Sequence, residues 1–186
     1  MQWVDDRLLA LTLRTGRPAT VEWAGASKFD PGDGRMRLSK ELRTGFWQVA
    51  GHPKHLDQYE VEARAIAADH ALRIATSRYR RVQALLGVDD ELALAAVQVC
   101  TEGLAAEVAR SGNDWHGLAR RLGLSVPEIR QLIASCQFGR HDVSVQASAQ
   151  ETLRKLGLPP LDAADCSLVL RRLIASYLHQ RHGVTI

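Results

Sequence analysis

The chain has 186 residues, of which 46% are hydrophobic and 24% are charged, and its formal net charge is +3. This composition describes a globular protein with a sizeable core, and it excludes a disordered chain and a simple polycation. No signal-peptide pattern and no apolar run near the ~20 residues of a membrane span are evident, so we expect no membrane association. Three widely spaced cysteines without a C-x-x-C pair favour a reduced, cytoplasmic setting.

Charge divides the chain into three parts. Residues 1–56 and 113–186 each carry nine Lys and Arg against six Asp and Glu, whereas residues 57–112 carry six against nine. The basic residues are 20 Arg and 4 Lys. Guanidinium groups suit phosphate and guanine, although a GC-rich coding sequence produces the same bias. We expect a small α/β N-terminal part (1–56), connecting long helices (57–112), and a C-terminal helical part (113–186).

The N-terminal part contains signals for both kinds of secondary structure. Apolar residues at helical spacing predict a helix over residues 1–15, ended by Gly16. Alternating apolar residues on both sides of the turn Pro31–Gly34 predict a β-hairpin or a three-stranded sheet within residues 19–39. A helix over residues 39–49 is expected to follow.

Two histidines, His52 and His55, come next. The region resembles the zinc peptidases that cleave phage-type repressors, because residues 35–38 and 59–63 match the strand and the glutamate-bearing helix on either side of their H-E-x-x-H motif. That motif is missing here, and Pro53 stands where its helix must run. We therefore expect no metal, no cofactor and no catalytic residue at this place, and interpret both histidines as surface loop residues.

The middle of the chain reads as two long helices, over residues 57–86 and from Asp89 or Asp90 to residue 108. His70 falls on the apolar face of the first helix, where we expect a hydrogen-bonded core histidine. The cations of Arg78–Arg81 complement the dipole at the C-terminal end of that helix, or form a second phosphate-contacting patch.

Residues 113–136 predict two short helices joined by a tight turn. An Asn–Asp pair at the start can cap the first helix, and Gly123 can end it. Ser125 and Glu128 form a capping box for the second helix. Apolar residues at helical spacing mark the buried faces, with Leu118, Ala119 and Leu122 on the first helix and Ile129, Leu132 and Ile133 on the second.

This unit resembles bacterial helix-turn-helix DNA-binding proteins, which place a small residue, here Ala119, on the first helix and glycine in the turn. The resemblance implies that the second helix lies in the major groove with its outward residues at base edges. Arg130 matches the edge of guanine and Gln131 that of adenine. The residues that the resemblance assigns to this contact are Ser125, Val126, Pro127, Arg130, Gln131 and Ala134. Nearby cations, expected to contact phosphates, are Arg120, Arg121 and Arg140.

Residues after the unit complete the predicted fold. A short β-wing is conceivable over residues 138–145, a helix over 148–156, and a hinge at 157–160. The last helix, over residues 162–182, has a wide apolar face that is either core or a homodimer seam. The expected class is α+β, mainly α, with a small β-containing N-terminal part followed by a helical domain that carries the helix-turn-helix.

The functional expectation is a sequence-specific or structural DNA-binding regulator of bacterial, phage or plasmid origin. The order of an α/β module and a helix-turn-helix also resembles ParB-type partition and plasmid regulators. One alternative is a protein–protein adaptor, because residues 115–129 are similar to death-fold interaction domains, with Trp115 as a core anchor. A second alternative is a divergent metallopeptidase or nuclease relative. Phosphate-binding and hydrolase motifs are missing, which favours a protein that is not an enzyme.

Overall fold

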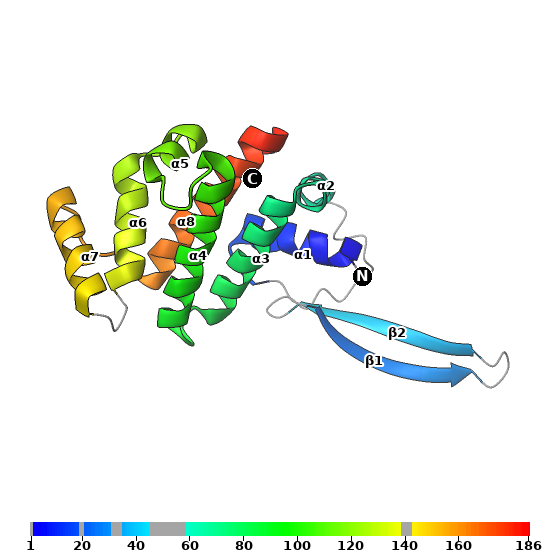
Figure 1. Cartoon of the computed structure of the whole chain (residues 1–186). Coiled ribbons are helices and arrows are strands. Elements are labelled where there is room, and N and C mark those ends of the chain that lie inside the picture. The colour runs from blue at the N-terminus through cyan, green and yellow to red at the C-terminus, as the bar shows by residue number, and fades with distance from the viewer. Residues whose placement is uncertain (1, 19–20, 31–34, 45–58, 139–142) are drawn as a thin grey trace.

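A computed structural model describes residues 2–18, 21–30, 35–44, 59–138 and 143–186, and the side chains of residues 5–18 and 59 onward within these ranges. Eight helices account for most of the described chain (Figure 1). They are α1 (Gln2–Thr15), α2 (Glu60–Ala68), α3 (His70–Leu85), α4 (Asp90–Ala109), α5 (Trp115–Leu122), α6 (Val126–Phe138), α7 (Val143–Leu156) and α8 (Ala163–His182).

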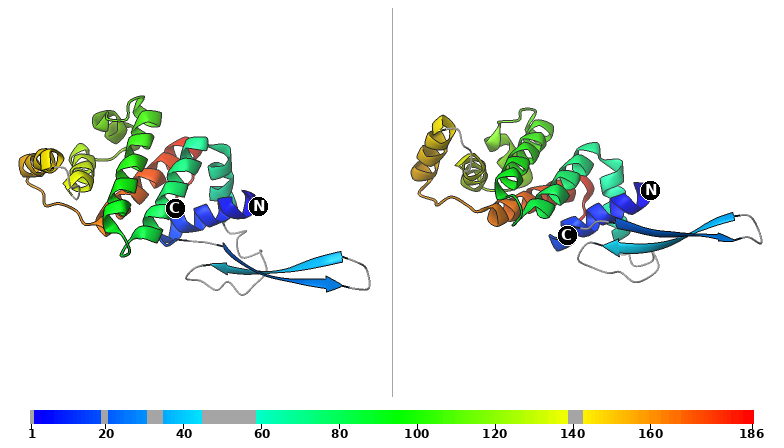
Figure 2. Two further views of the ribbon diagram at one scale, coloured as in Figure 1. Left: turned by 60° about the horizontal axis from the view of Figure 1, so that its bottom comes forward. Right: turned by 90° about the horizontal axis from the view of Figure 1, so that it is seen from below.

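The body of the molecule is all-helical, so the expected α+β class with a β-containing N-terminal part is wrong. The strands β1 (Val21–Asp30) and β2 (Arg35–Thr44) pair antiparallel with each other, and this hairpin stands apart from the helices (Figures 1 and 2). Within the described residues these two strands form a single two-stranded sheet. The segments with alternating apolar residues form a hairpin, but two strands are too few to enclose a core of their own.

Helix α8 lies in the middle of the core. Leu170, Leu173 and Ile174 are fully buried, and α8 packs against α3, α4, α5 and α6 (Figure 1). The apolar face that we considered as a homodimer seam is therefore occupied within a single chain. It is a core face.

Helix α1 is held against α2 and α3 by charge as well as by apolar packing. Leu9 and Leu13 are buried in the common core. Burial raises the pKa of Asp6, and the Arg73 guanidinium opposes that shift. Among the described residues, four ion pairs cross from α1 to its neighbours, joining Arg7 to Glu60, Arg14 to Glu62 at 2.9 Å, Asp6 to Arg73 at 3.1 Å, and Asp5 to Arg80 at 2.9 Å.

Several predicted element boundaries are wrong. The single helix expected over residues 57–86 is broken at Asp69, whose backbone is extended, and its neighbour His70 is exposed rather than buried. The helix expected from Ser39 is replaced by β2 as far as Thr44. The β-wing is also wrong, because Val143 begins α7. Local patterns alone did not distinguish helix from strand in these short stretches.

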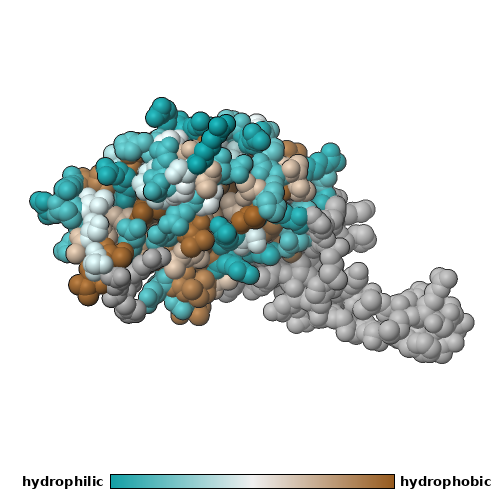
Figure 3. All heavy atoms as spheres, in the orientation of Figure 1, coloured by the Kyte–Doolittle hydropathy of each residue, from teal (hydrophilic) through white to brown (hydrophobic). Residues whose placement is uncertain are grey.

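Exposed apolar residues lie in separate patches on a mostly polar surface (Figure 3). Helix α4 meets the length and composition criteria for crossing a membrane, which core helices also meet. It packs here against α3, α5, α6 and α8.

Replacing Leu170 with alanine should lower the free energy of unfolding by about 2–5 kcal/mol, because it leaves a cavity in the centre of the core. Leu168→Ala on the same helix is the matched control, since Leu168 is 55% exposed. The control should change the free energy by less than about 0.5 kcal/mol. Urea unfolding followed by circular dichroism measures both. Equal losses in the two variants would contradict the central placement of α8.

Candidate nucleic-acid interface

The first helix of the predicted helix-turn-helix forms as expected. Asp114 caps α5 by accepting a hydrogen bond from the Gly117 N–H at 2.8 Å. Gly123 ends the helix with φ at +66°, and its N–H donates to the Ala119 carbonyl. The Leu124 N–H donates to the same carbonyl at 2.9 Å. This left-handed end turns the chain sharply into α6.

The second helix begins with half of the expected capping box. The Ser125 hydroxyl accepts a hydrogen bond from the Glu128 N–H at 3.3 Å. The Glu128 carboxylate does not return to the start of α6, because it forms an ion pair with Arg172 of α8. That ion pair joins the start of the candidate recognition helix to the central helix. Sequence reasoning missed Arg172, since nothing in a local pattern links residues 44 positions apart.

The three helices α4, α5 and α6 pack together as a tri-helical unit. The residues predicted for the buried faces of α5 and α6 are all buried, with Leu118, Ala119, Ile129 and Leu132 at 0% exposure. Helix α4 packs beneath both helices. The orientation of α6 is therefore set by its own apolar face.

Some of the predicted base-contacting residues are exposed, and the others are buried or covered by neighbouring segments. Ser125, Pro127 and Arg130 are exposed along the start of α6. Val126 is half-buried and packs against the core. These residues form a short edge, which we call the α6 edge and define as Ser125, Pro127 and Arg130.

The remaining predicted contacts along α6 are closed by neighbouring segments. Ala134 is 2% exposed and packs with Ala149 and Leu153 of α7. Gln131 is half-buried, and its side-chain amide donates a hydrogen bond to the Pro159 carbonyl at 2.8 Å. The outward face of α6 is thus open over its first turns and covered farther on.

Two of the three predicted phosphate-contacting cations lie among the described residues. Arg120 and Arg121 are both exposed at the end of α5. Arg121 lines a hollow against α8, together with Tyr177 and Arg181. Arg140 lies outside the described residues.

Asp69 is the most connected carboxylate away from the α6 edge. It accepts hydrogen bonds from the Leu72 N–H at 3.0 Å and from the Tyr177 hydroxyl at 3.1 Å, and His182 Nε2 lies 3.1 Å from it. Burial by itself raises the pKa of Asp69, but these hydrogen bonds outweigh it, so the pKa is lowered below its ordinary value. Arg181 adds a more distant positive charge at 3.9 Å.

The described residues contain no group of three or more His, Cys, Asp or Glu side chains that could hold a metal ion. His52 and His55 lie outside the described ranges, so their interpretation as loop residues stays a prediction. Cys100, Cys136 and Cys166 are buried, and none of them forms a disulfide. Burial raises the pKa of the Cys100 thiol to about 12, which makes it a poor nucleophile.

Comparison of the chain with protein-family models, with curated proteins and with solved structures found no significant match.

Replacing Gly123 with alanine should lower the free energy of unfolding by about 1–2 kcal/mol, because a side chain is strained at this positive φ. No atom would clash with the added Cβ, so backbone strain accounts for the whole loss. Gly123→Asn is the control, since asparagine adopts this conformation more readily. It should lose less than the alanine variant in thermal or urea unfolding. A greater loss with asparagine would contradict the left-handed turn.

Asp69→Asn should lower the free energy of unfolding by about 1–3 kcal/mol at neutral pH, since the hydrogen bonds lose their charged acceptor. The lowered pKa sets the sign of the pH dependence. The ionised Asp69 carboxylate contributes its full stabilisation at pH values above about 3.9, its pKa in the unfolded chain. This stabilisation is lost as the pH falls through the lower pKa that Asp69 has in the folded protein.

The difference between wild type and Asp69→Asn should therefore narrow in urea titrations below about pH 4. Asp89→Asn is the matched control. The Asp89 side chain accepts a hydrogen bond from the backbone N–H three residues later, as Asp69 does, but Asp89 is exposed. A difference that stays constant down to acidic pH would contradict the lowered pKa of Asp69.

Proposed function

We propose that the chain binds DNA through the α6 edge and acts as a cytoplasmic, non-enzymatic regulator of bacterial, phage or plasmid origin. The observation that carries this proposal is the exposure of Arg130 on the first turns of a helix that is capped by Ser125 and fixed to α8. An exposed guanidinium on such a helix can pair with both acceptors of guanine in the major groove.

The way α6 is covered restricts how it meets DNA. Because α7 covers Ala134 and the Gln131 amide is occupied, only the start of α6 is free to approach base edges. The helix N-terminus carries a partial positive charge that favours a nearby phosphate. Arg120 supplies a further exposed cation at the end of α5. This arrangement combines one specific contact with several contacts that do not depend on sequence.

A protein–protein adaptor is the second candidate function. The observation that favours it is the apolar corner where α6 meets α7, since Phe138 is 41% exposed and Val143 is 77% exposed. Exposed apolar residues beside a covered helix suit a protein partner better than a phosphate backbone. The two candidates differ in their response to salt, because phosphate contacts weaken steeply as salt rises.

Replacing Arg130 with alanine should cost about 1–3 kcal/mol of binding free energy on a selected DNA site and should relax the preference at one base position. Selection from random duplexes followed by fluorescence anisotropy measures both effects. Arg64→Ala is the matched control, because Arg64 is an exposed arginine on α2, away from the helix-turn-helix and from every predicted phosphate contact. This control should bind as the wild type does.

Two results would contradict the proposal. The first is the absence of any binding to random or genomic duplexes at low salt. The second is an equal loss with Arg130→Ala and Arg64→Ala, which would show that only net charge matters and that the α6 edge makes no specific contact.

A further inference from the structure

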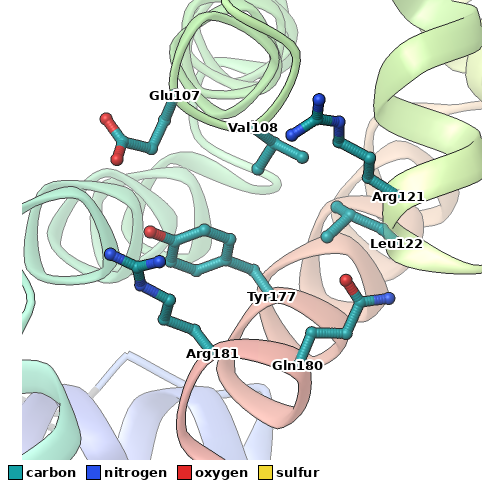
Figure 4. A pocket seen from close by; sticks show the side chains of 7 residues that line it. All are labelled: Glu107, Val108, Arg121, Leu122, Tyr177, Gln180 and Arg181. Atoms are coloured by element: carbon teal, nitrogen blue, oxygen red, sulfur yellow. The ribbon is translucent and has the colours of Figure 1, made fainter.

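A hollow of about 310 Å³ opens where the C-terminal ends of three helices meet. Glu107 and Val108 come from α4, Arg121 and Leu122 from α5, and Tyr177 and Arg181 from α8 (Figure 4). The hollow therefore joins the first helix of the helix-turn-helix to the central helix. None of the three α6-edge residues lines it.

One side of the hollow is acidic. Figure 4 shows Glu107, the Tyr177 hydroxyl and the Arg181 guanidinium on this side. The Tyr177 hydroxyl donates to Asp69, and the Arg181 guanidinium lies 3.9 Å from the same carboxylate. Burial and the charges of Asp69 and Glu107 raise the pKa of Tyr177 to about 12, so the hydroxyl stays neutral. Two carboxylates, those of Glu107 and Asp69, thus lie near one guanidinium, that of Arg181.

The opposite side is basic. Arg121 and Gln180 line it, with Leu122 between them as an apolar surface (Figure 4). Among the described residues, neither the Arg121 guanidinium nor the Glu107 carboxylate forms an ion pair within 4.0 Å. The hollow therefore presents a cation and an anion on facing sides, each without a charged partner of its own.

The helix ends add to this polarity. The lining residues come from the last turns of the three helices, where the partial negative charge of each helix dipole favours a bound cation. A simple anion would meet Arg121 but would also face Glu107 and these three helix ends. A simple cation would leave Arg121 unpaired. A molecule that carries both charges satisfies both sides, since opposite charges favour each other at short range.

We propose that this hollow binds a small zwitterion of the amino-acid class. The carboxylate pairs with Arg121 and accepts a hydrogen bond from the Gln180 amide, while the ammonium group pairs with Glu107. The apolar part of the molecule rests on Val108 and Leu122. Such a ligand bridges α4, α5 and α8.

The test uses the full chain and the standard L-amino acids, added singly at millimolar concentration. At least one should raise the melting temperature, by about 3–6 °C at ten times its Kd. Its N-acetyl derivative lacks the ammonium and its amide lacks the carboxylate. Calorimetry should show each derivative binding about 10–100-fold more weakly, as expected for the loss of a charge-assisted contact.

Variants assign each charge to its side chain. Arg121→Gln should weaken binding of the free amino acid about 10–100-fold, whereas Arg120→Gln, its neighbour outside the hollow, should leave it unchanged. Glu107→Gln should remove the preference for the free amino acid over its N-acetyl derivative. The proposal is overturned if no amino acid binds, if N-acetylation has no effect in the wild type, or if Arg121→Gln binds normally. Each readout is independent of DNA binding.

Discussion

The burial of one helix face holds this molecule together. Leu170, Leu173 and Ile174 of α8 are fully enclosed by helices that come from both halves of the chain. Apolar surface removed from water is the main stabilising contribution in such a body, and α8 buries its apolar face against α3, α4, α5 and α6. The same helix pairs with Glu128 through Arg172, and Arg171 donates to the Leu13 carbonyl at 2.7 Å. Apolar packing therefore positions α8, and polar contacts fix its neighbours to it.

This dependence makes the helix-turn-helix part of a larger body. The caps and the glycine turn shape α5 and α6 locally, but their placement relies on α4 below and α8 behind. The α6 edge is therefore presented by a helix that packs against α4, α5, α7 and α8, and such support on packed helices favours a defined docking geometry. The same packing also limits the exposed surface of α6. Because α7 is packed on the far part of α6, the surface offered to a partner is short.

Sequence-based predictions were right where the interacting residues are close in the chain, and wrong where those residues are far apart in the chain. The turn at Gly123, the cap at the start of α5, and the buried faces of α5 and α6 all depend on neighbours within a few positions, and they were predicted correctly. The break at Asp69 was missed because its partners Tyr177 and His182 come more than a hundred residues later. The covering of Ala134 by α7 was missed because alanine fits an exposed or a buried site equally well. The prediction of a β-containing N-terminal part was wrong for a related reason. An alternating apolar pattern predicts a strand, but it does not reveal whether other elements pack against that strand.

The place of α8 in the chain also determines how the protein can fold during synthesis. Every helix that encloses α8 precedes it in the sequence, and the hydrogen bond from Arg171 to Leu13 spans 158 positions. Contacts of such long range close slowly, because a large loop of chain must be ordered before they form. Helices α1 to α6 consequently leave the ribosome with the apolar surfaces meant for α8 still uncovered. A nascent chain of this design depends on protection from aggregation until α8 has emerged.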